Sequence, residues 1–268
     1  MSDKPAKSHG RKSITASLQP RDLIEAQPRL AHVWTAQVIT LVPQAFPGVL
    51  GESLTGKALK DGLWQLEAID LRPFGEGKHR NVDDTPAGGG AGMVLRADVM
   101  GRAIDHAHRS APTGARLIYL SPRGAPFTQA KAQELAQEPG ITLICGRFEG
   151  LDQRVIDHYG IEEISLGDYV LTGGEIAALA LIDATVRLRP GVLGNDASTE
   201  EESFSDGMLE HPHYTKPPEW NGHPIPPVLL SGNHGAVKKW RQDQSEELTR
   251  TRRPDLWQKH VRDKGDKN

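Results

Sequence analysis

An apolar strand that runs directly into a glycine-flanked turn decides the fold: Ile141-Thr142-Leu143-Ile144-Cys145, followed by Gly146-Arg147-Phe148-Glu149-Gly150. A short apolar run of this kind is typical of a strand buried inside a parallel sheet. Glycine permits backbone conformations that are forbidden to other residues, so the chain can turn sharply where the strand ends. The stretch therefore predicts a buried strand with a tight turn at its carboxyl end.

Strands and helices alternate on both sides of this stretch. We predict strands over residues 33–41, 63–70, 115–120, 141–145 and 162–165, and helices over residues 49–60, 96–109, 129–137, 152–159 and 174–187. Such alternation predicts an α/β fold in which helices cover both faces of a mostly parallel sheet. The length of 268 residues suits one such domain, alone or with a small second domain.

Three turns rich in glycine or proline follow predicted strands. They comprise residues 121–124, 146–150 and 167–174. Ligands of open α/β sheets bind beyond the carboxyl ends of the strands. We therefore expect the three turns to converge on one pocket.

The segments outside the predicted sheet differ in composition. Residues 1–32 show no periodicity and predict a disordered extension. Residues 72–94 form a long loop rich in Gly, Pro and Asp, and loops of this length are usually functional. Residues 191–234 predict a linker with ordered loops, and residues 235–262 predict one or two helices, broken at Pro254.

The net charge of −3 combines an acidic middle with basic ends. Residues 1–33 carry +3 and residues 206–268 carry +2, whereas residues 34–205 carry −8. A uniformly basic nucleic-acid binder is therefore excluded, while phosphate contacts from the ends and simple solvation of the ends both stay open. No apolar run approaches the roughly 20 residues of a membrane span, and a single cysteine excludes an internal disulfide. We expect a soluble, cytoplasmic protein with no membrane partner.

Three shorter sequence patterns are weaker indications of function than the three turns. Residues 51–58 nearly match a phosphate-binding P-loop, but Ala58 lacks the hydroxyl that would hold Mg²⁺, so nucleotide hydrolysis is a disfavoured alternative. His211 and His213 could form half of a metal site, although hydrogen bonding or stacking is the favoured interpretation without cysteines nearby. Cys145 is interpreted as a buried apolar residue.

Charged groups beside glycines or helix ends are candidates for ligand contact and acid/base work. The glycine run 88–92 follows Arg80 and two aspartates, which favours a ligand-contacting loop over a flexible tether. Asp183, Arg187 and the acidic run 200–202 are candidate acid/base groups. An acidic run is most often a solvated face, and an Arg after an apolar helix is most often a salt-bridge partner, so both plainer interpretations stay open.

Six longer strings occur in order between Trp34 and Trp257: residues 118–122, 145–155, 165–175, 187–194, 211–215 and 226–234. The third of them reads Ser165-Leu166-Gly167-Asp168-Tyr169-Val170-Leu171-Thr172-Gly173-Gly174-Glu175. Together they resemble the TrmD family of bacterial tRNA (guanine-N1)-methyltransferases. Several long motifs in a fixed order are a far more specific signal than the near-match to a P-loop.

The resemblance implies a SPOUT-class α/β fold whose parallel sheet carries a deep trefoil knot, a topology that periodicity alone does not predict. It implies a knotted, S-adenosylmethionine-binding domain over residues 33–195, a linker over 196–206 and a helical tRNA-binding domain over 207–268. It also implies methylation of N1 of guanosine 37 in tRNA by a homodimer, with each active site at the subunit interface. Mg²⁺ is implied as an accessory ion, with no residue assigned as its ligand.

The resemblance also assigns roles to residues. Arg187 matches the family's arginine near O6 of guanine. The family's proton acceptor is an Asp in a Glu-Asp-Ser-Phe string, and this chain has Glu201-Glu202-Ser203-Phe204, so Glu202 is the predicted base and Glu201 the second choice. The predicted cofactor site comprises Tyr119, Leu120, Ser121, Pro122, Gly146, Phe148, Glu149, Gly150, Leu166, Gly167, Asp168, Tyr169, Val170, Leu171, Gly173 and Gly174.

The chain departs from the family at two further positions, because Ala87 and Phe148 stand where the family usually has Tyr. The Glu202 replacement leaves open a second function, a catalytically weakened RNA-binding protein of the same fold. The tRNA surface would combine the glycine loop, the linker and the cations of the C-terminal helix, namely Lys238, Lys239, Arg241, Arg250, Arg252 and Arg253.

Overall fold

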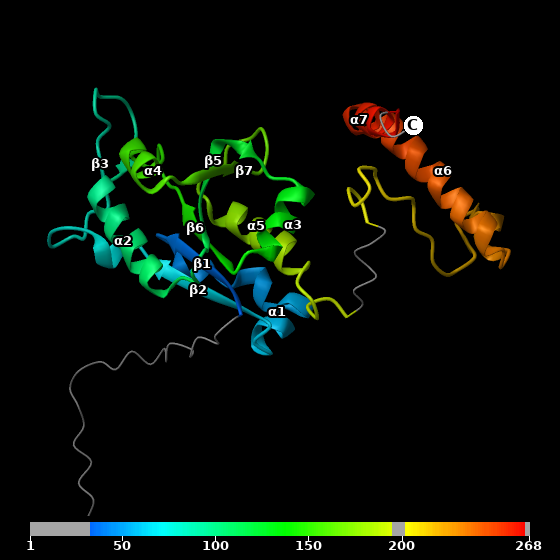
Figure 1. Ribbon diagram of the computed structural model, residues 1–268, viewed down its shortest axis with the longest axis horizontal. Coiled ribbons are helices and arrows are strands. Elements are labelled where there is room, and N and C mark those ends of the chain that lie inside the picture. Colours follow the sequence, from blue (N-terminus) through cyan, green and yellow to red (C-terminus); the bar gives the residue numbers. More distant parts are fainter. Residues whose placement is uncertain (1–32, 195–201, 266–268) are drawn as a thin grey trace, which may run out of the picture. The chain divides into compact units, whose positions relative to one another are not determined.

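A parallel sheet forms the centre of the computed structural model, which describes residues 33–194 and 202–265. Within these residues the sheet has five strands in the order β2-β1-β6-β5-β7 (Figure 1). The strands are β1 (Trp34–Thr40), β2 (Trp64–Asp70), β5 (Arg116–Pro126), β6 (Gly140–Cys145) and β7 (Glu162–Ser165). The predicted α/β fold with a parallel sheet is confirmed, whereas the trefoil knot stays a prediction.

The central strand β6 and its neighbour β1 are buried along their whole length. Every residue of β1 and β6 is buried, as expected for strands covered on both faces. Their register sets Val38 beside Leu143 on one side and beside Ala68 of β2 on the other. The stretch of residues 141–150 therefore combines a central strand with the turn that leaves it, as predicted.

Helices cover both faces of the sheet (Figure 1). One face packs against α1 (Ser53–Lys60), α3 (Gln129–Gln137) and α5 (Glu175–Val186). The other face packs against α2 (Ala97–Ser110) and α4 (Gln153–Tyr159). Each face thus has its own apolar cluster, and the sheet separates the two clusters.

Local sequence explains where these helices begin and which side they bury. In α2 the buried residues recur every three or four positions, as an amphipathic helix requires: Val99, Met100, Ala103, Ile104 and Ala107. The Asp152 carboxylate caps α4 by accepting from the Arg154 amide at 3.0 Å, and Gly160 ends that helix at φ +59°. The Thr128 hydroxyl caps α3 in the same way.

Two predicted elements differ from the structure. The predicted helix over 49–60 begins later, because Gly48–Gly51 form a 3₁₀ turn before α1. The predicted strand over 115–120 continues as β5 to Pro126, and the expected turn at residues 121–124 is a bulge inside it. Ile164 of β7 is the partner of both Leu120 and Ala125, so the residues between them are displaced from the ladder.

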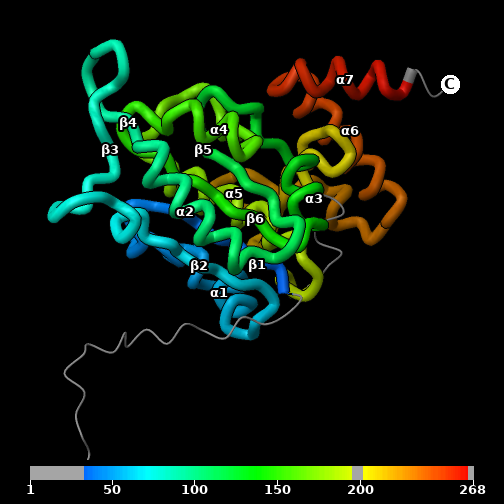
Figure 2. Tube along the Cα trace, turned by 60° about the vertical axis from the view of Figure 1, so that its left-hand side comes forward, coloured from blue at the N-terminus to red at the C-terminus, as the bar shows by residue number. Residues whose placement is uncertain are grey.

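The long loop over residues 72–94 contains a short antiparallel pair. Asp83 of β3 (Asp83–Asp84) pairs with Leu95 of β4 (Val94–Leu95). The loop that joins these strands extends away from the sheet (Figure 2). Its glycines at 88, 89, 90 and 92 all have positive φ, a conformation that favours glycine.

The C-terminal region contains two helices, α6 (His234–Arg252) and α7 (Pro254–Gly265), so the predicted break at Pro254 is confirmed. Before them a hairpin joins β8 (Glu219–Trp220) to β9 (His223–Pro224). None of the described helices combines the length and apolarity of a membrane span. The predicted domain boundaries stay predictions, and residues 1–32, Glu201 and most of the predicted linker lie outside the described residues.

Candidate functional site

A pocket of about 360 Å³ lies beyond the carboxyl ends of β6 and β7 and at the bulge of β5. All the predicted cofactor-binding residues line it except Asp168. The three predicted turns therefore converge on one pocket. The other lining residues were not predicted individually as cofactor-binding residues. Arg123, Arg147 and Thr172 lie in the three predicted turns, whereas sequence reasoning did not select Leu151, Ile164, Ser165 and Ala177.

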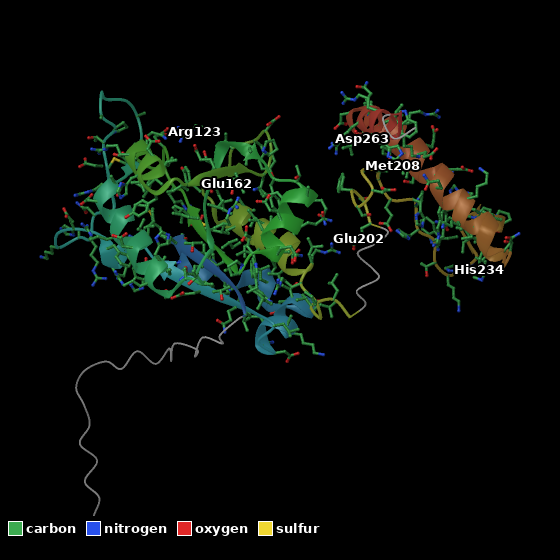
Figure 3. The ribbon with its side chains drawn as sticks, in the orientation of Figure 1. Arg123, Glu162, Glu202, Met208, His234 and Asp263 are labelled. Atoms are coloured by element: carbon green, nitrogen blue, oxygen red, sulfur yellow. The ribbon has the colours of Figure 1, made fainter. Side chains whose placement is uncertain are left out.

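The bulge of β5 forms the first wall. The Ser121 hydroxyl accepts from the Arg123 amide at 3.2 Å, which closes the bulge. A Cβ at Gly124 would lie 2.4 Å from the Ile164 nitrogen, so only glycine fits this close approach of two strands. The Arg123 side chain lies at the surface near α4 (Figure 3) and donates to the Gln153 side chain at 3.4 Å. It also pairs with Glu163 of β7 at 3.1 Å.

The turn after β6 forms the second wall and packs against Tyr119. A Cβ at Gly146 or at Gly150 would lie 2.8 Å from the Tyr119 hydroxyl oxygen, so glycine lets the turn close over the ring. Burial raises the pKa of the Tyr119 hydroxyl. Glu149 joins this wall to the long glycine loop, because its amide donates to the Met93 carbonyl at 2.9 Å.

The turn before α5 forms the third wall and lies directly on the second. The Gly174 amide donates to the Gly146 carbonyl at 3.0 Å, and Arg147 pairs with Gly173 in an antiparallel bridge. A Cβ at Gly174 would lie 2.7 Å from the Cα of Cys145. Glycine is therefore required here because two backbones approach closely, not because of the backbone conformation.

The two predicted catalytic side chains pair with each other. Arg187 follows the last residue of α5, and its Nη1 donates to Oε2 of Glu202 at 2.6 Å, while its Nη2 donates to Oε1. The guanidinium lowers the pKa of the Glu202 carboxyl, and the carboxylate raises the pKa of Arg187. Neither residue lines the pocket of the single chain.

Other predicted groups have simpler surroundings. The Asp183 carboxylate accepts from the Thr55 hydroxyl at 3.4 Å at the surface. The rings of His211 and His213 lie 4.8 Å apart and are tilted by 50°, so they are not stacked, whereas the contact of His213 with Glu210 at 2.8 Å fits the predicted hydrogen bonding. Within the described residues, no cluster of three or more His, Cys, Asp or Glu is arranged to hold a metal ion, so the structure adds no support for a Mg²⁺ site.

The near-match to a P-loop has a packing explanation. Residues 51–58 run from a 3₁₀ turn into α1 rather than from a strand into a phosphate loop. A Cβ at Gly56 would lie 2.0 Å from the Gly51 carbonyl oxygen, so the two glycines let the turn and the helix pack together. The disfavoured hydrolase interpretation gains nothing from this geometry.

The predicted RNA-binding cations lie on α6 and at the α6–α7 junction, and several have acidic neighbours. Lys239 pairs with Asp243 at 2.8 Å, Arg253 pairs with Asp255 at 2.6 Å, and Arg250 pairs with Glu247. These pairs are exposed, and exposed pairs contribute little free energy. Phosphate groups could therefore compete for the same cations.

We expect Cys145 to be inert in the folded protein. It is 1% exposed at the end of β6, and burial raises the pKa of its thiol well above the usual value, so little thiolate forms. A maleimide should label it only after denaturation, as mass spectrometry would measure. Rapid labelling of the native protein would contradict this burial.

Comparison with known proteins agrees with this geometry. The family profile described as tRNA (Guanine-1)-methyltransferase TrmD matches residues 34–259. A protein named tRNA (guanine-N(1)-)-methyltransferase from Ruegeria pomeroyi is 70% identical over 239 residues, covering 89% of this chain and 98% of the relative. Proteins of the same name from Jannaschia sp. and Mesorhizobium japonicum are 67% and 61% identical, covering 88% and 84% of this chain and 97% of each relative. The chain therefore belongs to the TrmD family of tRNA methyltransferases.

Proposed function

We propose that this protein transfers a methyl group from S-adenosylmethionine to N1 of guanosine 37 in tRNA. In this proposal it acts in the cytoplasm as a homodimer. The observation that carries the proposal is the convergence of three glycine-rich turns on one pocket at the ends of parallel strands, in a chain of this family. The names of the relatives supply the guanine-N1 and tRNA parts of the proposal.

The residues of the pocket suit this cofactor. Gly146, Gly150 and Gly174 allow the close backbone packing that bends the turns around a ligand, and main-chain groups of such turns suit the polar edge of an adenine. Leu120, Leu166 and other apolar side chains suit its faces. When bound, S-adenosylmethionine supplies an electrophilic methyl group on a sulfonium.

Guanine N1 carries a proton and is a poor nucleophile until that proton leaves, so the chain must provide a base and a partner for charge on O6. The pairing of Glu202 with Arg187 suits both tasks. A carboxylate has about four lone-pair sites, and the pair uses two of them, so Glu202 keeps sites that can accept the N1 proton. Arg187 keeps N–H groups that can donate to O6.

The dimer part of the proposal has its own support. The two proposed catalytic residues do not line the pocket of their own chain. Large apolar side chains around the pocket are exposed, with Val170 at 83%, Ile176 at 62% and Phe148 at 56%. A second subunit would cover such side chains and could bring its own Glu202 and Arg187 to the pocket.

The pKa of Glu202 predicts the pH dependence of the reaction. The base must be deprotonated, and Arg187 lowers its pKa from the usual 4.5. As pH falls, kcat/KM should therefore stay level until the pH drops below the usual glutamate value, provided that the protein stays folded. A pH series under single-turnover conditions measures this. An acidic limb centred above pH 5 and assigned to Glu202 would contradict the pairing.

Methyl incorporation tests the proposed function. The protein is incubated with methyl-labelled S-adenosylmethionine and unmodified tRNA carrying guanosine at position 37, beside the same tRNA carrying adenosine there. We expect label in the first tRNA only. Binding of both tRNAs without label in either would favour the catalytically weakened RNA-binding protein instead.

A further inference from the structure

A buried carboxylate lies behind the pocket, in the first turn of α5. Glu175 is 6% exposed, and acidic side chains are rarely this buried unless they are paired. It is not among the residues that line the pocket. The proton transfer and the binding surfaces proposed above do not use it, so its burial needs another explanation.

The Glu175 carboxylate joins separate parts of the chain. Its Oε1 accepts from the Thr40 hydroxyl at 2.7 Å and from Nε of Arg147 at 3.3 Å. Its Oε2 lies 2.9 Å from Nη2 of Arg147. Thr40 is the last residue of β1 and is fully buried, and its hydroxyl also accepts from the Val42 amide at 2.9 Å. Glu175 therefore connects the end of a central strand to the second wall of the pocket.

The same ion pair lies against the third wall. A Cβ at Gly173 would lie 2.4 Å from Nε of Arg147 and 2.5 Å from Oε2 of Glu175. Gly173 is also the bridge partner of Arg147. The backbone of the third turn thus lies directly on the ion pair, and the ion pair lies beside the second turn.

A buried ion pair is weak support for stability, and it can instead fix one arrangement of the groups around it. Arg147 has a planar, rigid guanidinium, so two contacts with one carboxylate restrict its orientation strongly. The Thr40 hydroxyl restricts the carboxylate in turn. The spacing between the second and third walls therefore depends on these three side chains.

We propose that Glu175 is a positioning residue that, through Arg147 and Thr40, holds the turns at residues 146–150 and 167–174 at the spacing that the cofactor requires. This inference rests on the proposed function, because it assumes that S-adenosylmethionine binds between these turns. Glu175 itself has no contact with the reacting atoms. It acts on the affinity of the pocket and not on the proton transfer.

Glu175→Gln tests the proposal, because the amide keeps the size of the side chain but loses the charge that pairs with Arg147. We expect the Kd of sinefungin, a cofactor analogue, to rise about tenfold in calorimetry, since small displacements of binding groups weaken binding strongly. The KM for S-adenosylmethionine should rise similarly. The kcat at saturating cofactor and the affinity for tRNA should stay within about threefold of the values for the unchanged protein. This change is smaller than the tenfold rise expected in the Kd of sinefungin.

The matched control is Glu162→Gln. Glu162 is a half-buried carboxylate on β7 (Figure 3) that pairs with Arg116 at 3.0 Å and with Lys131 at 2.7 Å. It is not among the residues that line the pocket. The Glu162→Gln substitution removes an ion pair comparable to that of Glu175 with Arg147, and it should leave the Kd of sinefungin unchanged. A decrease in melting temperature without a change in Kd would show that lost ion pairing alone does not weaken the site.

Thr40 provides a second, independent pair of variants. Thr40→Val removes the hydroxyl at nearly constant shape and should weaken sinefungin binding about threefold, the effect of one hydrogen bond. Thr40→Ser keeps the hydroxyl and should restore the affinity. If Glu175→Gln does not fold, the two Thr40 variants test the positioning role in its place. Equal Kd values for Thr40→Val and Thr40→Ser would overturn that role.

The outcomes separate this inference from the function on which it rests. If the unchanged protein releases no heat with sinefungin, the proposed function fails. If the unchanged protein binds and a folded Glu175→Gln variant binds equally well, Glu175 is not a positioning residue and the proposed function stands.

Discussion

Glu202→Gln should lower the single-turnover rate of methyl transfer by about 10²- to 10⁴-fold, the usual contribution of a positioned general base. The amide cannot accept the N1 proton, and the proton must leave before N1 can attack the methyl group. Glu202 does not line the pocket of its own chain, so the Kd of the cofactor should change little. Quenched-flow incorporation of labelled methyl into tRNA measures the rate, and calorimetry measures the Kd.

Glu210→Gln is the matched control for this variant. Glu210 is a nearby carboxylate that pairs with His213 at 2.8 Å, and no role in the reaction is proposed for it. The rate of methyl transfer by Glu210→Gln should stay within about twofold of the rate of the unchanged protein, because most surface substitutions have small effects. A near-normal rate for Glu202→Gln would remove Glu202 from the role of base, and Glu201 would be the next residue to test.

Gly174→Ala should weaken cofactor binding by about tenfold to a hundredfold, because overpacking by one methyl group costs roughly 1–3 kcal/mol. Gly174 has φ −78°, so alanine can adopt its backbone conformation without strain. The added Cβ would instead lie 2.7 Å from the Cα of Cys145 and 3.1 Å from the Gly146 nitrogen. These are backbone atoms, so the second and third walls must move apart.

Gly194→Ala separates this steric effect from a general effect of losing glycine. A Cβ at Gly194 meets no atom within 4 Å. This variant should bind sinefungin with an unchanged Kd. Equal affinities for Gly174→Ala and Gly194→Ala, measured by calorimetry on folded proteins, would show that the close approach of the two turns does not set the affinity of the pocket.

Regular elements with strong local signals could be predicted closely from the sequence. The predicted bounds of α3 and β7 match the structure, because Thr128 caps the helix and the short strand lies between turns at Gly160 and Gly167. β5 was predicted too short, because Pro122 and Gly124 signal a turn and the sequence does not reveal that β7 continues the ladder beyond them. The hairpin at Asn221-Gly222 was missed although Asn-Gly is a strong hairpin signal.

The candidate site could be predicted as a set of turns but not as a geometry. The placement of ligand sites at strand ends predicted that the three turns converge, and they do. The contacts between Arg147 and Glu175 and between Arg187 and Glu202 depend on how distant segments pack. Such packing has no local signal in the chain, and the roles of Arg187 and Glu202 came from the family resemblance.

Identification of the modified nucleoside tests the central claim most directly. Unmodified tRNA with guanosine at position 37 is incubated with the protein and S-adenosylmethionine, digested, and analysed by mass spectrometry of its fragments and nucleosides. The proposed function predicts one 1-methylguanosine per tRNA, in the fragment that contains the nucleotide 3′ of the anticodon. An unmethylated guanosine at that position, or a methyl group on another atom or nucleotide, would contradict it.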